Sequence, residues 1–360
     1  MTLSTVSSQA FFMADDNAPL SPKQLDVTQA EAEHVIQPHS MANDFGPEAM
    51  AVLWVGVSLH ALSLGHPSRT ANPGYRDNAR SCHPTRKVLC WANIEKAAMR
   101  KNRFRELLLA GQPTLGTHVL SAWPTLLELV GHTRVYDYVE FTAEYAPFDM
   151  HDLDNLGRAL VVADLVGMIK IEQQQWTHQA MRAIGSGFQS VLFADVRTVE
   201  DAQACVRAVR PETPIAQGRH GVGMRRNVGV VLEGGSPAYV RALEEIVLAI
   251  MVEKRECVED LDVILSTKGI DMVQFGPADY SMSIGLAGQW SHPDVLRAER
   301  ETIETALKKG IHPRVELTDP RDAAPYLEMG VKHFCIGWDV EILHGWWQAN
   351  GRNMRELLGG

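Results

Sequence analysis

The stretch that decides the fold is IVLAIMVEKRECVEDLDVILSTKGIDMVQFGPAD, residues 246–279. An apolar run at 246–252 suits one buried strand, a helical pattern follows at 256–266, and a second apolar strand follows at 270–275. Two buried strands joined by a helix are typical of a parallel pair in one sheet, because a parallel connection must cross back along the sheet. The stretch therefore predicts a parallel sheet covered by helices.

The same alternation continues on both sides of this unit. The other strands are predicted at 115–119, 137–142, 166–171, 188–193, 311–315 and 332–336. Helices are predicted between them near 123–131, 152–163, 177–184, 198–209, 294–309 and 319–329, with a last helix near 340–357. Eight strands, each followed by a helix over about 250 residues, predict a (β/α)8 TIM barrel. A doubly wound open sheet is the alternative, but it needs a Gly-rich loop after the first strand, where Gly116-Thr117-His118 supplies none.

Three segments need a separate reading. An amphipathic helix is predicted at 93–110, ending at Gly111, and opens a barrel domain of residues 93–360. Residues 1–92 are polar with little periodicity, and we expect an N-terminal extension without catalytic residues. Its one apolar run, 49–65, is at the lower limit for a bilayer span and contains a histidine, so a packed helix or strand is favoured.

Composition excludes several classes of protein. The 360 residues contain 34 Lys and Arg against 44 Asp and Glu, a formal charge of −10, which disfavours nucleic acid and anionic membranes as partners. The five cysteines lie far apart and their odd number makes a poor disulfide framework. No basic segment followed by an apolar run is found near the first residue. We therefore expect a cytoplasmic protein in a reducing compartment.

Catalytic groups of such a barrel lie at the C-terminal ends of its strands. Glu253 ends an apolar strand, where an ionised carboxylate is costly unless it is paired or bound to a cation. Asp279 closes FGPAD after the next strand. Two carboxylates on adjacent strand ends, with water and substrate oxygens completing the shell, are typical of Mg²⁺ sites. The alternative from spacing alone is that Glu253 pairs with Lys254 or Arg255 while Asp279 caps a helix.

Several stretches make the sequence similar to a known family. They are EYAPFD at 144–149, AIGSGFQSVLF at 183–193, GRHGVG at 218–223, MVEK at 251–254, QFGPADYSMSIG at 274–285 and CIGWD at 335–339. On these motifs residues 93–360 resemble the HpcH/HpaI aldolases, metal-dependent enzymes that cleave 4-hydroxy-2-oxo acids to pyruvate and an aldehyde. The resemblance covers about three quarters of the chain.

The resemblance implies a site and an assembly. Glu253 and Asp279 would be the metal ligands, and the Pro277–Asp279 backbone amides would meet the carboxylate of the bound 2-oxo acid. The substrate-binding set is then Gly276, Pro277 and Ala278. In this family the final helix often swaps onto a neighbouring subunit, so a homo-oligomer, a trimer or a hexamer, is also implied.

The proton-transfer half of the site departs from the family pattern. Tyr145 stands where the family has its general-base histidine, and Thr142 stands in place of the aspartate that orients it. Lys170 replaces the arginine that grips the 2-oxo acid. Ala183 and Met251 replace a second aspartate and a glutamine. A lysine offers a compact charge rather than a planar fork, and a tyrosine is a poor base at neutral pH.

The base therefore has three candidates: Tyr145, a metal-bound hydroxide and His118 at the end of the first strand. Lys170 is predicted to bind the substrate carboxylate. The alternative is that its amine forms a Schiff base with the substrate. Arg225, together with Arg219 and Arg226 on a Gly-rich loop at 212–237, either binds a second carboxylate or phosphate or is simply solvated. We expect this loop on the catalytic rim, after the fourth strand.

Three functions are carried forward. The first is a carbon–carbon lyase of the aldolase type that acts on a 2-oxo acid aldol through a metal-stabilised enolate, with Mg²⁺ or Mn²⁺, or else Co²⁺. The second is a metal-dependent decarboxylase of an oxaloacetate-like acid, which needs no base for a hydroxyl group. The third is a binder of small carboxylates without catalysis.

Overall fold

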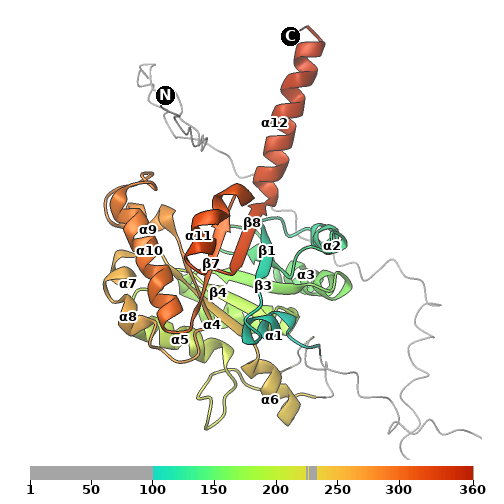
Figure 1. Cartoon of the computed structure of the whole chain (residues 1–360). Coiled ribbons are helices and arrows are strands. Elements are labelled where there is room, and N and C mark those ends of the chain that lie inside the picture. The colour runs from blue at the N-terminus through green and yellow to red at the C-terminus, as the bar shows by residue number, and fades with distance from the viewer. Residues whose placement is uncertain (1–99, 224–225, 227–232, 360) are drawn as a thin grey trace, which may run out of the picture. The chain divides into compact units, whose positions relative to one another are not determined.

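Eight parallel strands close into a barrel in the computed structural model, which describes residues 100–223, 226 and 233–359 (Figure 1). The strands follow one another round the barrel in chain order, and the last pairs with the first. They are β1 (Thr114–Val119), β2 (Tyr138–Thr142), β3 (Val166–Ile171), β4 (Ser190–Phe193), β5 (Val247–Val252), β6 (Met272–Phe275), β7 (His312–Leu317) and β8 (His333–Trp338). The predicted TIM barrel is confirmed, with each strand within two residues of its expected bounds.

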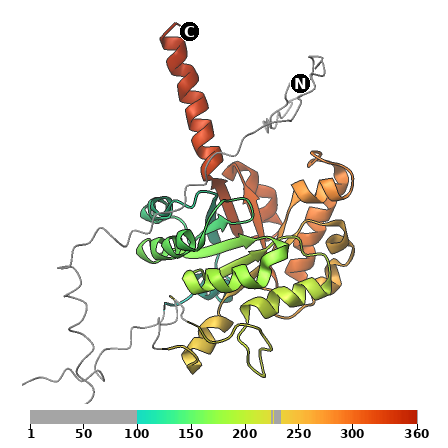
Figure 2. The ribbon, with the colours of Figure 1, turned by 180° about the vertical axis from the view of Figure 1, so that it is seen from behind.

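Helices cover the outside of the barrel, and Figure 2 shows α3, α4 and α5 lying across the strands from behind. The longer ones are α2 (Pro124–His132), α3 (Met150–Val162), α4 (Trp176–Ser186), α5 (Val199–Val209), α6 (Pro237–Glu244), α10 (Pro293–Lys308) and α12 (Asp339–Leu357). The shorter ones are α1 (Arg103–Leu109), α7 (Arg255–Glu259), α8 (Leu261–Ile264), α9 (Pro277–Ser283) and α11 (Ala324–Glu328), with single 3-10 turns η2 (Gln173–Gln175) and η4 (Pro320–Ala323).

The core has two layers, as a closed barrel requires. One large cluster lies between the outer face of the strands and the helices. A second cluster fills the lower part of the barrel, where Met168, Leu192 and Met251 point inward. Helix α1 closes this end, since Phe104 is fully buried and stacks on the ring of Tyr138 with centroids 4.6 Å apart. The N-terminal end of the barrel is therefore plugged, and access to its interior is from the other end.

Local sequence explains where two helices begin. The helix predicted at 93–110 is found at Arg103–Leu109 as α1, but residues 100–102 are not helical, and 93–99 lie outside the described residues. The Asn102 side chain caps it by accepting a hydrogen bond from the Arg105 N–H. Helix α3 begins two residues earlier than predicted because Asp149 and Asp152 form a capping box.

The described residues of the Gly-rich loop, 212–223, 226 and 233–237, do not lie on the catalytic rim, and for them that expectation was wrong. The loop follows α5 rather than β4 and leads through α6 into the first residue of β5, so it belongs to the N-terminal end of the barrel (Figure 1). Arg210, at its start, donates to the carbonyl of Ile246, just before β5 begins. Arg226 donates to the carbonyl of Ser186, the last residue of α4.

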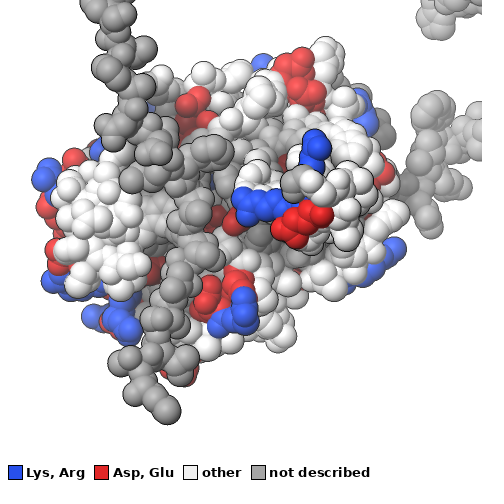
Figure 3. Space-filling view, turned by 90° about the horizontal axis from the view of Figure 1, so that it is seen from above, with Lys and Arg blue, Asp and Glu red and all other residues white. Residues whose placement is uncertain are grey.

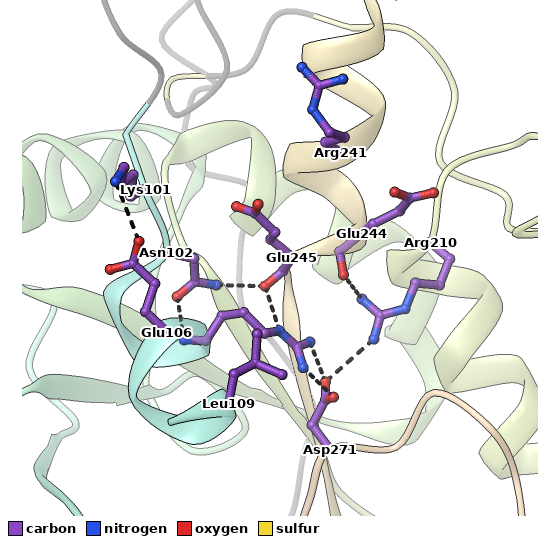
Figure 4. Close-up of a pocket in the computed structure, with 10 residues that line it drawn as sticks. Lys101, Asn102, Glu106, Leu109, Arg210, Arg241, Glu244, Glu245 and Asp271 are labelled. Atoms are coloured by element: carbon purple, nitrogen blue, oxygen red, sulfur yellow. Dashed lines mark hydrogen bonds and ion pairs between the residues drawn. The ribbon is translucent and has the colours of Figure 1, made fainter. Parts of the chain in front are cut away.

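A polar hollow of about 560 Å³ lies at the same N-terminal end (Figure 4). Arg105 and Arg210 converge there on Asp271 and also donate to the carbonyls of Glu245 and Ile246. The two arginines and Asp271 neutralise one another, and the hydrogen bonds of Arg105 hold α1 against the barrel. It lies opposite the end where the strands finish, and we assign it no chemistry.

Two further expectations lie outside the described residues: the extension 1–92 and the apolar run 49–65. The described residues all belong to the second of two units of the chain, residues 86–360. Within the part of the chain that the structure describes, no helix is long and apolar enough to cross a membrane.

Candidate active site at the C-terminal end of the barrel

The chemistry-bearing side chains gather where the strands end. Figure 3 looks down onto this end of the barrel, from which α12 projects, and both positively and negatively charged side chains are exposed on it. Glu253 follows β5, Asp279 lies in the first turn of α9 after β6, and Asp195 follows β4. The barrel thus brings together carboxylates from three neighbouring strand ends.

Glu253 is the most deeply placed of these carboxylates. Only 2 % of the residue is exposed, and its Oε1 accepts a hydrogen bond of 2.7 Å from the Asp195 N–H. Asp195 supplies that N–H from a left-handed conformation with φ 58°, which costs free energy in a residue other than glycine. Burial raises the pKa of Glu253, and the nearby carboxylates of Asp279 and Glu144 raise it further, against the opposing effect of Lys170 and of this hydrogen bond.

Lys254 stands between the other two carboxylates. Its Nζ lies 2.6 Å from Asp279 Oδ1 and 2.7 Å from Asp195 Oδ1, and 10 % of its side chain is exposed. The alternative pairing of Glu253 with Lys254 is not what the structure shows, because Lys254 instead pairs with Asp279. Burial lowers the pKa of Lys254, but the hydrogen bonds to Asp195 and Asp279 outweigh it and the pKa is raised.

The segment 276–279 offers fewer amides than its motif implies. Pro277 has no N–H, and the Gly276 N–H already donates to the carbonyl of Val252 in the sheet. The predicted role of the Pro277 amide is therefore wrong, and Ala278 and Asp279 carry the only amides left to meet a carboxylate. Gly276 has a different importance: a Cβ there would lie 2.8 Å from both Cβ and Oε2 of Glu253, so only glycine lets that carboxylate sit against the chain.

Lys170, Glu144 and Tyr145 form a second cluster beside Glu253. Lys170 is the last residue but one of β3 and is 7 % exposed. Its Nζ lies 2.7 Å from Glu144 Oε2 and 3.5 Å from the Tyr145 hydroxyl. Burial lowers the pKa of Lys170, but the charges of Glu253, Tyr145 and Glu144 outweigh it and raise the pKa above its usual range. Lys170 therefore remains an ammonium group at neutral pH.

Tyr145 is not a base at rest. Partial burial of the phenol raises the pKa of Tyr145 to about 12; Glu144 and Glu253 add to this, and Lys170 opposes it. The hydroxyl therefore keeps its proton at neutral pH and can donate a hydrogen bond or a proton to a bound substrate. Thr142 is turned away from this cluster, since its Oγ1 donates to Glu140 Oε1 at 3.2 Å.

His118 is paired inside the mouth of the barrel. Its Nδ1 lies 3.3 Å from Glu316 Oε1, and its ring packs edge-on against Trp338. Burial lowers the pKa of His118, but the nearby Cys335 thiol and the carboxylates of Glu316 and Glu140 outweigh this and raise the pKa to about 10. Burial raises the pKa of Glu316, but His118 outweighs it and holds that pKa at about 2. His118 is thus a cation at neutral pH.

Below this mouth, a chain of hydrogen bonds crosses the barrel interior. Arg314 is 1 % exposed, forms an ion pair with Glu140 and donates to the Tyr138 hydroxyl at 2.7 Å and to the side-chain oxygen of Gln274. Gln274 in turn donates to Glu316 Oε2 at 3.1 Å. The network links the paired His118 to the buried Arg314, and it gives the floor of the site a fixed polar structure.

The raised pKa of His118 should make the stability of the folded protein depend on pH. Its pKa in the folded protein, about 10, lies above the unfolded value of about 6.5. The stability that the charged histidine contributes is therefore fully present below about pH 6.5 and is lost as the pH rises through 10. We expect the His118 ring protons to titrate near pH 10 by NMR, and His118→Gln to lose less stability than the wild type between about pH 7 and 10.5. A titration near pH 6.5 would contradict the pairing.

The donor set fits a divalent cation. Glu253 is a buried carboxylate with other carboxylates close by. Asp279 already binds a positive charge, the ammonium group of Lys254. Hard cations such as Mg²⁺ prefer carboxylate oxygens and keep several waters. Among residues 100–223, 226 and 233–359 no cluster of three or more His, Cys, Asp or Glu is arranged as a metal site. A divalent ion at Glu253 and Asp279 would therefore have two protein donors among the described residues, and water and substrate would fill the remaining positions.

The two arginines of the Gly-rich loop that the structure describes, Arg219 and Arg226, do not join this site. Arg225 lies outside the described residues. Arg226 forms an ion pair with Asp154 at 2.6 Å, and Arg219 lies on the same loop at the N-terminal end of the barrel. The structure thus gives Arg226 a structural partner rather than a substrate.

Sequence reasoning missed most of the partners that control the charges of the site, and it weighed Lys254 only as a partner of Glu253. The partners that it missed are Asp195, Glu144, Glu316, Arg314 and Gln274. All lie at or near strand ends, and that position was the only signal in the sequence that marked them. Which of them pair depends on neighbouring strands that are far apart in the chain.

Comparison with known proteins agrees with the geometry. The family described as HpcH/HpaI aldolase/citrate lyase matches residues 115–344. A hydroxypyruvate/pyruvate aldolase of Pseudomonas aeruginosa is 30 % identical over 72 % of this chain and 92 % of its own length. A 2-keto-3-deoxy-L-rhamnonate aldolase of Klebsiella pneumoniae is 30 % identical over 68 % and 90 %. The crystal structure of an HpcH/HpaI aldolase/citrate lyase family protein from Burkholderia cenocepacia superposes with a TM-score of 0.64 at 25 % identity, over 71 % of this chain and 99 % of that one.

Proposed function

The chain belongs to the HpcH/HpaI aldolase/citrate lyase family, and on that premise we propose that it is a divalent-metal-dependent carbon–carbon lyase that cleaves an aldol of a 2-oxo acid. The observation that carries the proposal is Glu253, a carboxylate that is 2 % exposed at a strand end and lies near the carboxylate of Asp279. Mg²⁺ or Mn²⁺, with Co²⁺ as a further candidate, would be held by these two residues. When bound, the ion would act as a Lewis acid on the 2-oxo group.

The chain's own residues divide the remaining tasks. The Lys170 ammonium, held by Glu144, would bind the substrate carboxylate together with the amides of Ala278 and Asp279. The protonated Tyr145 hydroxyl, 3.5 Å from Lys170, would donate to the substrate oxygens. Glu144 is the carboxylate of this cluster, and we propose that it accepts the proton of the C4 hydroxyl when the C3–C4 bond breaks. His118 is a cation, so it would attract negative charge on the substrate and would not act as a base.

A decarboxylase of an oxaloacetate-like acid is the second candidate, and the charge states favour it. Tyr145 and His118 keep their protons at neutral pH, and Lys170 is an ammonium group. Loss of CO₂ from a 3-carboxy-2-oxo acid leaves the same enolate as aldol cleavage but needs no proton removed from a hydroxyl. The same carboxylates and the same anchor would serve both reactions.

One assay separates these functions. The full chain is incubated with 4-hydroxy-2-oxo acids or with oxaloacetate, with Mg²⁺, Mn²⁺ or EDTA, and pyruvate is measured. The proposal predicts pyruvate from a hydroxy-oxo acid, dependent on the metal and reduced in Glu144→Gln. Turnover of oxaloacetate alone, unaffected by Glu144→Gln, would favour the decarboxylase. Metal-dependent binding without any turnover would leave the non-catalytic binder.

The protonation state of Lys170 argues against a Schiff base with the substrate. Because its pKa is raised rather than lowered, the amine is protonated and does not attack a carbonyl at neutral pH. We expect no mass adduct on Lys170 after incubation with pyruvate and sodium borohydride, and we expect Lys170→Met to raise KM for the 2-oxo acid by at least about tenfold, the cost of a charge-assisted hydrogen bond. A trapped adduct at Lys170 would replace the anchor with a Schiff base.

Helix α12 supports a homo-oligomer, as the family resemblance implies. It projects from the end of the barrel in Figure 1, and large apolar side chains on it are exposed, including Trp346 at 63 % and Trp347 at 61 %. Exposed apolar surface of this kind is covered in stable proteins, and we propose that a second copy of the chain covers it. Light scattering should give a multiple of 39.9 kDa, and Trp346→Glu with Trp347→Glu should give the 39.9 kDa monomer. A monomeric wild type would contradict this.

A further inference from the structure

The Lys254 ammonium occupies a cation position between two carboxylates at the centre of the proposed metal site. Its Nζ makes both contacts at 2.7 Å or less, to Asp195 and to Asp279, and the residue as a whole is 8 % exposed. The contact to Asp279 involves one of the two residues that would bind the ion. A lysine so placed must either move or share that carboxylate when a metal ion arrives.

The Lys254 ammonium offsets part of the negative charge at this position. Its Nζ bridges the carboxylates of Asp195 and Asp279, and Glu253 is tied to the same strand ends by the hydrogen bond that its Oε1 accepts from the Asp195 N–H. The two aspartates and the ammonium carry a formal charge of −1. Without the ammonium the two aspartates carry −2, and neither is held by a lysine.

We propose that Lys254 is a positioning residue that weakens divalent-metal binding: it holds Asp279 and Asp195 in place in the ion-free site and competes with the ion for Asp279. The inference rests on the proposed function, because it requires an ion at Glu253 and Asp279. Lys254 is the first residue after that glutamate, and β5 carries both to the same strand end.

Two physical effects have the same sign. An ammonium close to a divalent cation repels it, and the repulsion is large at the low effective dielectric constant of a partly buried site. Removing the ammonium also frees Asp195 to act as a third carboxylate, and hard cations bind more tightly as carboxylate ligands are added. A neutral residue at 254 should therefore increase the affinity for the ion. Damage to the fold would have the opposite effect.

The experiment measures Mn²⁺ binding directly, by electron paramagnetic resonance of the free ion at neutral pH, with the full chain. The variants are Lys254→Met and Lys254→Gln, the second of which can still hydrogen-bond to the aspartates and so preserves the local structure. Arg255→Met is the matched control, since it removes the neighbouring positive charge from a side chain that is 57 % exposed and is paired with Glu259.

We expect both Lys254 variants to bind Mn²⁺ at least about tenfold more tightly than the wild type, about 1.4 kcal/mol, and Arg255→Met to bind within about twofold. Adding Asp195→Asn to Lys254→Met should reverse most of the gain. Equal or weaker binding in both Lys254 variants, with normal wild-type binding that Glu253→Gln abolishes, would overturn the inference and leave the proposed metal site intact. Absence of Mn²⁺ binding in the wild type and in every variant would overturn both.

Discussion

Replacing Glu253 by glutamine should lower metal-dependent turnover by at least about 1000-fold, which corresponds to about 4 kcal/mol of lost transition-state stabilisation. The side chain keeps its size and its Oε1 can still accept the Asp195 N–H, so the fold should be preserved. What is lost is the buried negative charge, which is the main attraction for a divalent ion. Turnover and Mn²⁺ binding are both measured, and both should fall.

Glu256 provides the matched control for this change. It lies one turn further along the chain in α7, its side chain is 47 % exposed, and it pairs with Arg197 at the surface. Glu256→Gln removes the same charge three residues away and should change turnover by less than about threefold, because exposed ion pairs contribute little. If Glu253→Gln and Glu256→Gln behaved alike, Glu253 would have no special role.

Replacing Arg314 by methionine should lower the free energy of unfolding by about 3–5 kcal/mol. The guanidinium is fully buried in the barrel interior, and its removal leaves Glu140, which is 2 % exposed, without its cation. The Tyr138 hydroxyl and the Gln274 side chain also lose a hydrogen-bond partner. Denaturant unfolding, monitored by circular dichroism, measures the change.

Two controls identify the buried charge as the cause. Arg297→Met removes an arginine whose side chain is 65 % exposed and paired with Asp294, and it should cost less than about 1 kcal/mol. Arg314→Met combined with Glu140→Met should cost less than the sum of the two single changes, because no unpaired charge remains. Additive costs, or a loss below about 1 kcal/mol for Arg314→Met, would contradict the account.

The sequence was sufficient to predict the fold and the position of Glu253 and Asp279 at strand ends, because both depend on local signals. Apolar runs of four to seven residues alternating with amphipathic helices specify eight strands whatever their neighbours are. Glu253 is conspicuous because a carboxylate directly after the run IVLAIMV must be buried at a strand end. Asp279 follows the next strand in the same way, so spacing and topology together place the two carboxylates at one end of the barrel.

The rest of the site was not predictable because it depends on pairing between distant strands. Lys254 was weighed as a partner of its neighbour Glu253, but it reaches Asp195 and Asp279 on the two adjacent strand ends. His118 was weighed as a base, but Glu316, almost 200 residues away, makes it a cation. The loop at 212–237 was assigned to the wrong end of the barrel although a helix was predicted at 198–209, because the loop was counted from the fourth strand and not from the helix that precedes it.

The central claim is that this barrel uses a divalent ion at Glu253 and Asp279 to form the enolate of a 2-oxo acid. The most direct measurement is deuterium incorporation at the methyl group of pyruvate in D₂O, followed by mass spectrometry with Mg²⁺, Mn²⁺ or Co²⁺ and with EDTA. We expect incorporation that requires the metal and is lost in both Glu253→Gln and Asp279→Asn. No incorporation above the protein-free rate with any of the three metals, or incorporation that persists in EDTA, would contradict it.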